Sequence, residues 1–214
     1  MTTALERNTL LIDEYLLEFD ETRIEHLVID GPIGMVYETM RNVDFLMVHS
    51  PITDLALFVR TLPEKIGRLR NRNEPPAPPL PALKLSAMFD REGFERPDVL
   101  EGWVALAEEH GREIVFGAIG KPWLADIEWK TVPAEDFAGF DEPGWAKITC
   151  SISVREYGSS RTILTYEART AMTDADSRQR FGRYWTVVSP FVGTIMRALL
   201  RTVADEMPDE FEID

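Results

Sequence analysis

The stretch RTILTYEARTAM, residues 161–172, followed by SRQRFGRYWTVVSPFVGTIMRALLRTVA, residues 177–204, decides the fold. The first part is predicted to be a β-strand and the second a long amphipathic helix. Apolar side chains recur in the helix at i, i+3, i+4, i+7, i+11, i+14 and i+18, a single stripe of 3.6-residue period over about five turns. The stripe consists of Phe181, Tyr184, Trp185, Val188, Val192, Ile195 and Leu199.

Local preferences oppose this helix. Gly182 and Gly193 each cost about 1 kcal/mol relative to alanine and Pro190 about 3 kcal/mol, so the helix forms only if its apolar face is buried. We therefore expect a sheet beneath it and a kink near Ser189-Pro190. Thr173, three residues before Asp176, gives a start that resembles a capping box.

Composition limits the classes of function. The chain has 214 residues, enough for a sizeable core, and a net charge of −14, which argues against binding nucleic acid or anionic membranes. A single cysteine, Cys150, fits a reducing compartment. The start lacks the features of a signal peptide, and no unbroken apolar run approaches the length needed to span a membrane. These features predict a soluble, cytoplasmic protein without membrane insertion.

The rest of the chain predicts one domain over 1–214. Residues 1–20 form a peripheral segment, either a short helix or a segment lying along the domain, and the acidic tail 205–214 is expected to be solvated. Two shorter helices are predicted after Pro32 and Pro51. The proline-rich stretch 71–81 is a connector or a lid. The predicted strands are 22–30, 83–90, 102–108, 112–119, 127–132, 145–155 and 161–171.

The strand at 145–155 shows how the sheet is built. Apolar residues at 146, 148, 150, 152 and 154 alternate with polar ones, which predicts a half-buried antiparallel strand. Tyr157-Gly-Ser-Ser160 turns the chain into the next strand. The expected architecture is α+β: a seven-stranded antiparallel sheet curled around the C-terminal helix, with the two shorter helices between strands 1 and 2.

This order resembles the helix-grip fold of the START-like (SRPBCC) superfamily, which includes Bet v 1-type carriers, lipid-transfer domains and polyketide cyclases. Several stretches are similar to a bacterial family of unassigned function within it. They are Tyr15-Leu-Leu-Glu-Phe-Asp20, Val59-Arg-Thr-Leu-Pro63, Gly117-Ala-Ile-Gly-Lys-Pro-Trp123, Thr165-Tyr-Glu-Ala-Arg169 and Phe181-Gly-Arg-Tyr-Trp185. The resemblance implies an apolar cavity between sheet and helix. It implies no reaction, because such folds serve carriers, sensors and enzymes alike.

Catalytic and metal-binding patterns are scarce in the sequence. His26, His49 and His110 lack metal-ligand spacing, so we expect neither a metal nor a cofactor. The stretch Gly117–Lys121 lacks the spacing of a phosphate-binding loop. Cys150 is expected to be a small core residue.

Glu167 and Arg169 are the first candidate ligand-binding residues. Two residues apart on one strand, they share a face of the sheet. They are either a solvent-facing pair or a polar anchor inside the cavity. A two-residue turn at Gly158-Ser159 would place Glu167 opposite Cys150 on the apolar side, which favours the inward interpretation.

Four further candidates are Tyr166 on the same strand and Tyr184, Trp185 and Val188 on the helix stripe. The aromatic residues are either core or a platform for a ligand. The leading hypothesis is binding of an apolar or amphipathic small molecule such as a lipid, a polyketide or an aromatic metabolite. The alternatives are a cyclase/aromatase-type enzyme, with Tyr166 or Tyr184 as proton acceptor, and an interaction module whose cavity is filled by its own side chains. A homodimer is compatible with each.

Overall fold

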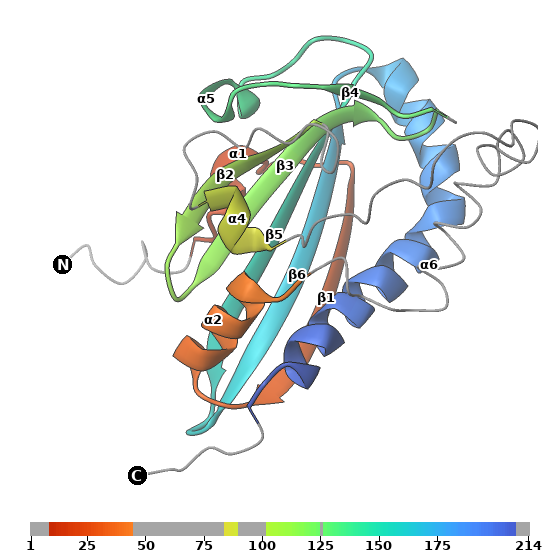
Figure 1. Cartoon of the computed structure of the whole chain (residues 1–214). Helices are drawn as coiled ribbons and strands as arrows, with labels where there is room; N and C mark the ends of the chain where they lie inside the picture. The colour runs from red at the N-terminus through yellow and green to blue at the C-terminus, as the bar shows by residue number, and fades with distance from the viewer. Residues whose placement is uncertain (1–8, 45–83, 90–101, 125, 209–214) are drawn as a thin grey trace, which may run out of the picture.

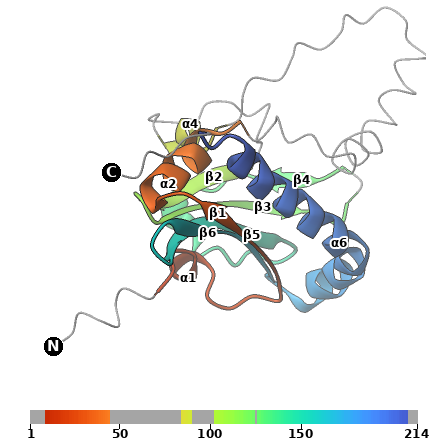
Figure 2. The same cartoon turned by 90° about the horizontal axis from the view of Figure 1, so that it is seen from below.

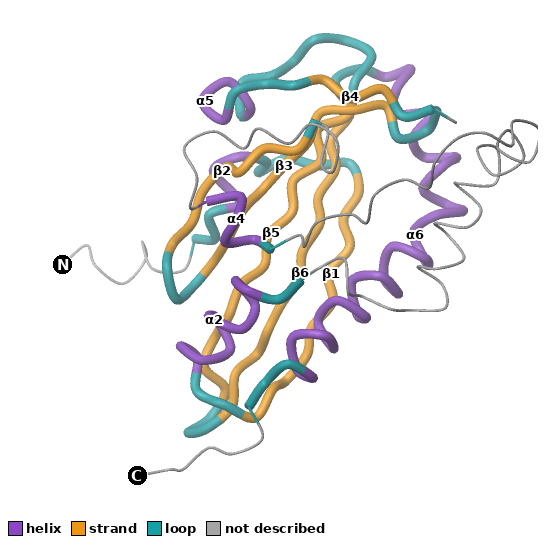
Figure 3. Tube along the Cα trace, in the orientation of Figure 1, coloured by secondary structure: helices purple, strands orange, loops and turns teal. Residues whose placement is uncertain are grey.

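The computed structural model describes residues 9–44, 84–89, 102–124 and 126–208 (Figure 1). Its helices and strands are shown by type in Figure 3. In chain order they are α1 (Ile12–Tyr15), β1 (Glu21–Asp30), α2 (Ile33–Asn42), α4 (Leu85–Phe89), β2 (Trp103–Glu109), β3 (Glu113–Lys121), β4 (Glu128–Lys130), α5 (Ala134–Phe137), β5 (Ala146–Tyr157), β6 (Arg161–Met172) and α6 (Ala175–Asp205).

The strands form one antiparallel sheet. Their order is β1-β6-β5-β3-β2, and β4 pairs with β3 beside this path. The sheet curls, and α6 lies along it next to β1 and β6, while α2 covers β5 and β6 farther along (Figures 1 and 2). The predicted α+β architecture, a curled sheet against a long C-terminal helix, is confirmed.

The predicted number of strands is wrong. The described residues form six strands, because the stretch predicted as a strand at 83–90 contains helix α4 instead. Leu85 and Met88 are both buried, and their spacing of three residues puts them on one side of a helical turn, where a strand would point them to opposite faces. The second predicted helix, after Pro51, and the proline-rich stretch 71–81 lie outside the described residues.

The sheet buries both of its faces around the hairpin of β5 and β6. We call the side that α6 and α2 cover the helix face; it carries the even-numbered residues of these strands, such as Cys150 and Tyr166. We call the opposite side the outer face; it carries the odd-numbered residues, such as Ser151 and Glu167. Ser151, Ser153 and Thr149 are buried there. The alternation of β5 predicted that only its apolar face would be buried, and this prediction is wrong.

Helix α6 begins two residues earlier than predicted and continues through Pro190. Asp174, rather than Thr173, is its N-cap: one carboxylate oxygen accepts from the Ser177 amide at 2.9 Å and the other from the Ser177 hydroxyl at 2.7 Å. These bonds, with one from the Gly144 amide, lower the pKa of Asp174 to about 2. Thr173 instead exchanges hydrogen bonds with the backbone of Trp145.

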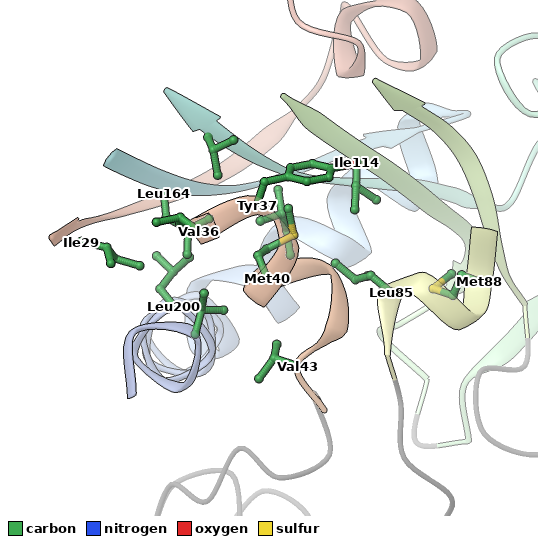
Figure 4. Close-up of a cluster of buried hydrophobic side chains, with 13 residues drawn as sticks. Ile29, Val36, Tyr37, Met40, Val43, Leu85, Met88, Ile114, Leu164 and Leu200 are labelled. Carbon is green, nitrogen blue, oxygen red and sulfur yellow. The ribbon is translucent and has the colours of Figure 1, made fainter. Parts of the chain in front are cut away.

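The largest cluster of buried apolar side chains joins α2, α4 and α6 to the sheet (Figure 4). Val36, Tyr37 and Met40 of α2 are fully buried in it. Leu164 of β6 and Leu200 of α6 contribute from the other two sides. A Tyr37 hydroxyl bond of 2.5 Å to Glu108, which also accepts from Arg41, ties α2 to β2.

A crossing of side chains fixes α6 against β1. The Arg23 guanidinium occupies the space where a side chain at Gly193 would lie, so a larger residue at this point of the helix would displace it. Arg23 Nε lies 2.8 Å from Glu25 Oε1, and Arg197 Nη1 of α6 donates to the same oxygen at 2.8 Å. Gly193 lowers the helical propensity of α6, but its missing side chain leaves room for the charged contact between helix and sheet.

The two glycines of α6 give a matched prediction. Gly182→Ala should stabilise the protein by about 1 kcal/mol, because alanine favours the helix and nothing lies within 4 Å of the added Cβ. Gly193→Ala should bring no such gain, because the Cβ would lie 2.5 Å from Arg23 Nε and displace that side chain from Glu25, a loss of up to about 1 kcal/mol that offsets the helical gain. Chemical denaturation of both variants measures the difference. Equal stabilisation by both would show that Arg23 does not cross at Gly193.

Candidate functional site

A cavity of about 210 Å³ lies between the sheet and α6. Its walls come from β2, β5 and β6 on the sheet side and from both halves of α6. The lining residues are Trp103, Ile148, Cys150, Tyr166, Ala168, Thr170, Phe181, Tyr184, Trp185, Val192, Ile195 and Met196. The cavity is thus aromatic beside the first half of α6 and aliphatic beside the second.

Ring contacts build the aromatic end. Phe181 stacks on Trp185 with ring centroids 5.6 Å apart and lies 5.7 Å from the Tyr184 ring. Trp123, from the turn after β3, meets Phe181 edge-on at 6.4 Å. The i, i+3 and i+4 spacing of the stripe places these rings side by side on one helix face, so the sequence pattern itself produces this wall.

The polar groups of the cavity are neutral. The Tyr166 hydroxyl and the Cys150 thiol lie beside each other on the sheet side of the cavity. Burial raises the pKa of Cys150 to about 12, and burial together with the neighbouring thiol raises the pKa of Tyr166 well above its usual value. Both groups therefore keep their protons at neutral pH. Neither group acts as a general base at neutral pH. Tyr166 is therefore not the proton acceptor that the sequence suggested.

Three of the sequence candidates line this cavity: Tyr166, Tyr184 and Trp185. Val188 lies one turn away and lines an open groove of about 490 Å³ with Trp123, Arg180, Arg183 and Val187. Tyr184 borders both spaces. Sequence reasoning missed Trp103 and Thr170. Thr170 could have been found, because it is an even-numbered residue of the strand 161–172 and therefore shares a face with Tyr166. The position of Trp103 depends on long-range strand pairing that no local pattern shows.

Glu167 and Arg169 lie on the outer face, so the inward interpretation is wrong. Tyr157 pairs with Arg161, which makes the hairpin loop three residues long instead of two. This difference of one residue places Glu167 opposite Ser151 rather than Cys150 and moves the pair to the other face. The pair is not solvent-facing either, since both side chains are only 8% exposed.

The N-terminal segment buries this pair. Arg169 Nε lies 2.6 Å from Glu167 Oε1, and Nη1 donates to Asp13 at 2.7 Å and to the Leu16 carbonyl at 2.9 Å. The Phe19 ring lies 4.9 Å from the guanidinium carbon. Residues 9–20 thus comprise the short helix α1 and an irregular stretch after it, and both lie along the domain and cover polar side chains on the outer face.

A second buried carboxylate holds the start of the same segment. Glu113 of β3 has no exposed surface, and its oxygens accept from the amides of Leu11 and Ile12 at 2.8 and 3.3 Å and from the Ser151 hydroxyl at 2.7 Å. These bonds replace lost hydration of the carboxylate. The outer face is therefore a docking surface for the chain's own N-terminal segment, and its charged residues take no part in the cavity.

Two further findings bear on function. Within the ranges that the structure describes, no group of three or more His, Cys, Asp or Glu residues is placed to hold a metal ion. By length and hydropathy, α6 reaches the threshold of a membrane-spanning helix, a test that core helices of soluble proteins also pass.

The sequence matches no protein-family profile and no curated protein. Several solved structures align over most of the chain. They include a hypothetical protein from Helicobacter pylori (8% identity, 94% of this chain and 95% of that one, TM-score 0.41), norcoclaurine synthase from Thalictrum flavum (10%, 94% and 94%, 0.32) and the Zhui aromatase/cyclase from a Streptomyces species (10%, 88% and 96%, 0.29).

The buried pair gives the prediction for this region. Arg169→Met should cost about 3–5 kcal/mol, because it leaves Glu167 buried without its cation. Glu167→Gln should cost only about 1–3 kcal/mol, since Arg169 keeps Asp13 as a partner. The double variant should cost less than the sum of the two, as measured by denaturation. Additive effects below about 1 kcal/mol would contradict the burial of the pair.

Proposed function

We propose that the protein binds an apolar or amphipathic small molecule in the cavity between the sheet and α6. The observation that carries this proposal is the cavity itself, about 210 Å³ of space lined by aromatic and aliphatic side chains with a few neutral polar tips. An engineered apolar cavity of about 150 Å³ is known to hold benzene. The present volume therefore suits a compound of one or two rings rather than a long lipid chain.

A cyclase/aromatase-type enzyme is the second candidate, and the lining supports it less. Such a reaction needs groups that exchange protons near neutral pH. Among the described residues of the lining none is Asp, Glu, His, Lys or Arg, and the pKa values of Cys150 and Tyr166 are raised away from neutrality. Buried groups with such pKa values favour binding of a ligand over its chemical conversion.

The space also speaks against an interaction module whose core is filled by its own side chains. Three large aromatic residues of α6 border the cavity without closing it. A cytoplasmic location, the exclusion of nucleic acid and a possible homodimer stay predictions from composition and resemblance.

A substitution that fills the cavity tests the proposal. Ala168→Leu adds apolar volume to the cavity wall and should reduce the affinity for naphthalene at least tenfold, measured by quenching of tryptophan fluorescence. Trp103 and Trp185 line the cavity and provide the signal. Native mass spectrometry of freshly purified wild-type protein, which should retain a small ligand that Ala168→Leu loses, gives an independent measurement.

Ala171→Leu is the matched control. It adds the same side chain to the same strand on the outer face, away from α6, and should leave naphthalene binding unchanged. Equal loss of binding in both variants, or equal binding in all three proteins, would contradict a ligand site between sheet and helix.

A further inference from the structure

We propose that the cavity selects an uncharged ring compound that carries one hydroxyl or carbonyl oxygen, which hydrogen-bonds to Tyr166 beside Cys150. This inference rests on the proposed binding function and specifies its ligand class. It begins from the polar atoms among the lining residues of β5 and β6, which are the hydroxyls of Tyr166 and Thr170 and the thiol of Cys150.

The weak partner of Tyr166 is the first argument. A buried tyrosine hydroxyl needs a hydrogen-bond partner, and the polar group beside Tyr166 is the Cys150 thiol. Sulfur is a poor donor and acceptor compared with oxygen. A ligand oxygen within reach would therefore give the hydroxyl a stronger partner than the thiol. Glu113 and Arg169 on the outer face differ in this respect, since they already have several oxygen or nitrogen partners.

The second argument is that no charged side chain among the described residues lines the cavity. The charged groups nearest in register are Glu21, Arg23 and Glu25 of β1, which lie opposite Thr170, Ala168 and Tyr166. Arg23 and Glu25 bind each other at 2.5–2.8 Å, and Arg197 binds the same carboxylate oxygen. The cavity lining includes none of these four residues. A carboxylate or ammonium ligand would enter an apolar space without a partner for its charge, at a large desolvation cost.

The position of the pair within the cavity is the third argument. Tyr166 and Cys150 lie on the sheet side, and α6 contributes the rings of Phe181, Tyr184 and Trp185 on the other. A flat ring held against these aromatic side chains can direct a substituent toward the sheet. The arrangement suits a compound with one polar edge and an otherwise apolar perimeter, such as a phenol or an aromatic ketone.

Three probes of the same skeleton test this selectivity at pH 7: naphthalene, 2-naphthol and 2-naphthoate, titrated into the full-length protein with tryptophan fluorescence or calorimetry as readout. We expect 2-naphthol to bind roughly 3- to 10-fold more tightly than naphthalene, the effect of one hydrogen bond. We expect 2-naphthoate to bind at least about 100-fold more weakly than 2-naphthol, because its charge stays unpaired.

Tyr166→Phe separates the hydroxyl from the ring. It should remove the advantage of 2-naphthol over naphthalene and leave the affinity for naphthalene unchanged. Tyr157→Phe, the same substitution at the exposed hairpin, should change neither affinity.

Each outcome decides between the ideas. If naphthalene binds but 2-naphthol gains nothing, or if 2-naphthoate binds as tightly as 2-naphthol, the selectivity proposed here is wrong while the cavity remains a binding site. If 2-naphthol keeps its advantage in Tyr166→Phe, the anchor is wrong. If none of the three probes binds, the proposed function fails and this inference fails with it. The comparison of the three probes on wild-type protein needs no variant to fold.

Discussion

The register between β5 and β6 is the constraint on which the rest of the structure depends. Ser151 lies opposite Glu167 and Cys150 opposite Ala168, and this pairing assigns every side chain of the two central strands to one of two buried faces. On the helix face the residues are small or apolar and leave a cavity beneath α6. On the outer face they are polar and bind the N-terminal segment. A shift of one residue would place Glu167 and Arg169 under the helix and the apolar set under α1.

The two coverings differ in how they are held. Helix α6 lies against the sheet through apolar contacts and is oriented by the charged contact among Arg23, Glu25 and Arg197. The N-terminal segment is attached mainly by hydrogen bonds to buried carboxylates and to Arg169. Apolar contacts tolerate empty space more readily than buried charges tolerate lost partners.

Much of the fold follows from local sequence patterns, and most errors concern long-range geometry. The stripe of α6, the alternation of β5 and the apolar positions of α2 each appear as periodicity, so these elements are predictable. The buried face of α6 is predictable only in its first part, since Phe181 is buried but farther along Met196, Leu200 and Val203 are buried in place of Val192, Ile195 and Leu199. The face of Glu167 is not, because it depends on whether the loop after Tyr157 has two or three residues. The strand predicted at 83–90 fails because a short apolar run suits either structure, and burial of Leu85 and Met88 decides for the helix. The contribution of Trp103 to the cavity and the crossing of Arg23 at Gly193 arise from residues far apart in sequence, so local patterns carry no trace of them.

The only cysteine of the chain lies in the wall of the cavity, and this gives the molecule an internal spectroscopic reporter. The S–H stretching vibration absorbs in a region of the infrared spectrum where other protein groups are nearly silent, and its frequency and width depend on the hydrogen bond that the thiol makes. Every S–H signal from this protein therefore originates at Cys150. A molecule that takes over the Tyr166 hydroxyl would alter that one band directly, without any label, substitution or change in the covalent structure of the chain.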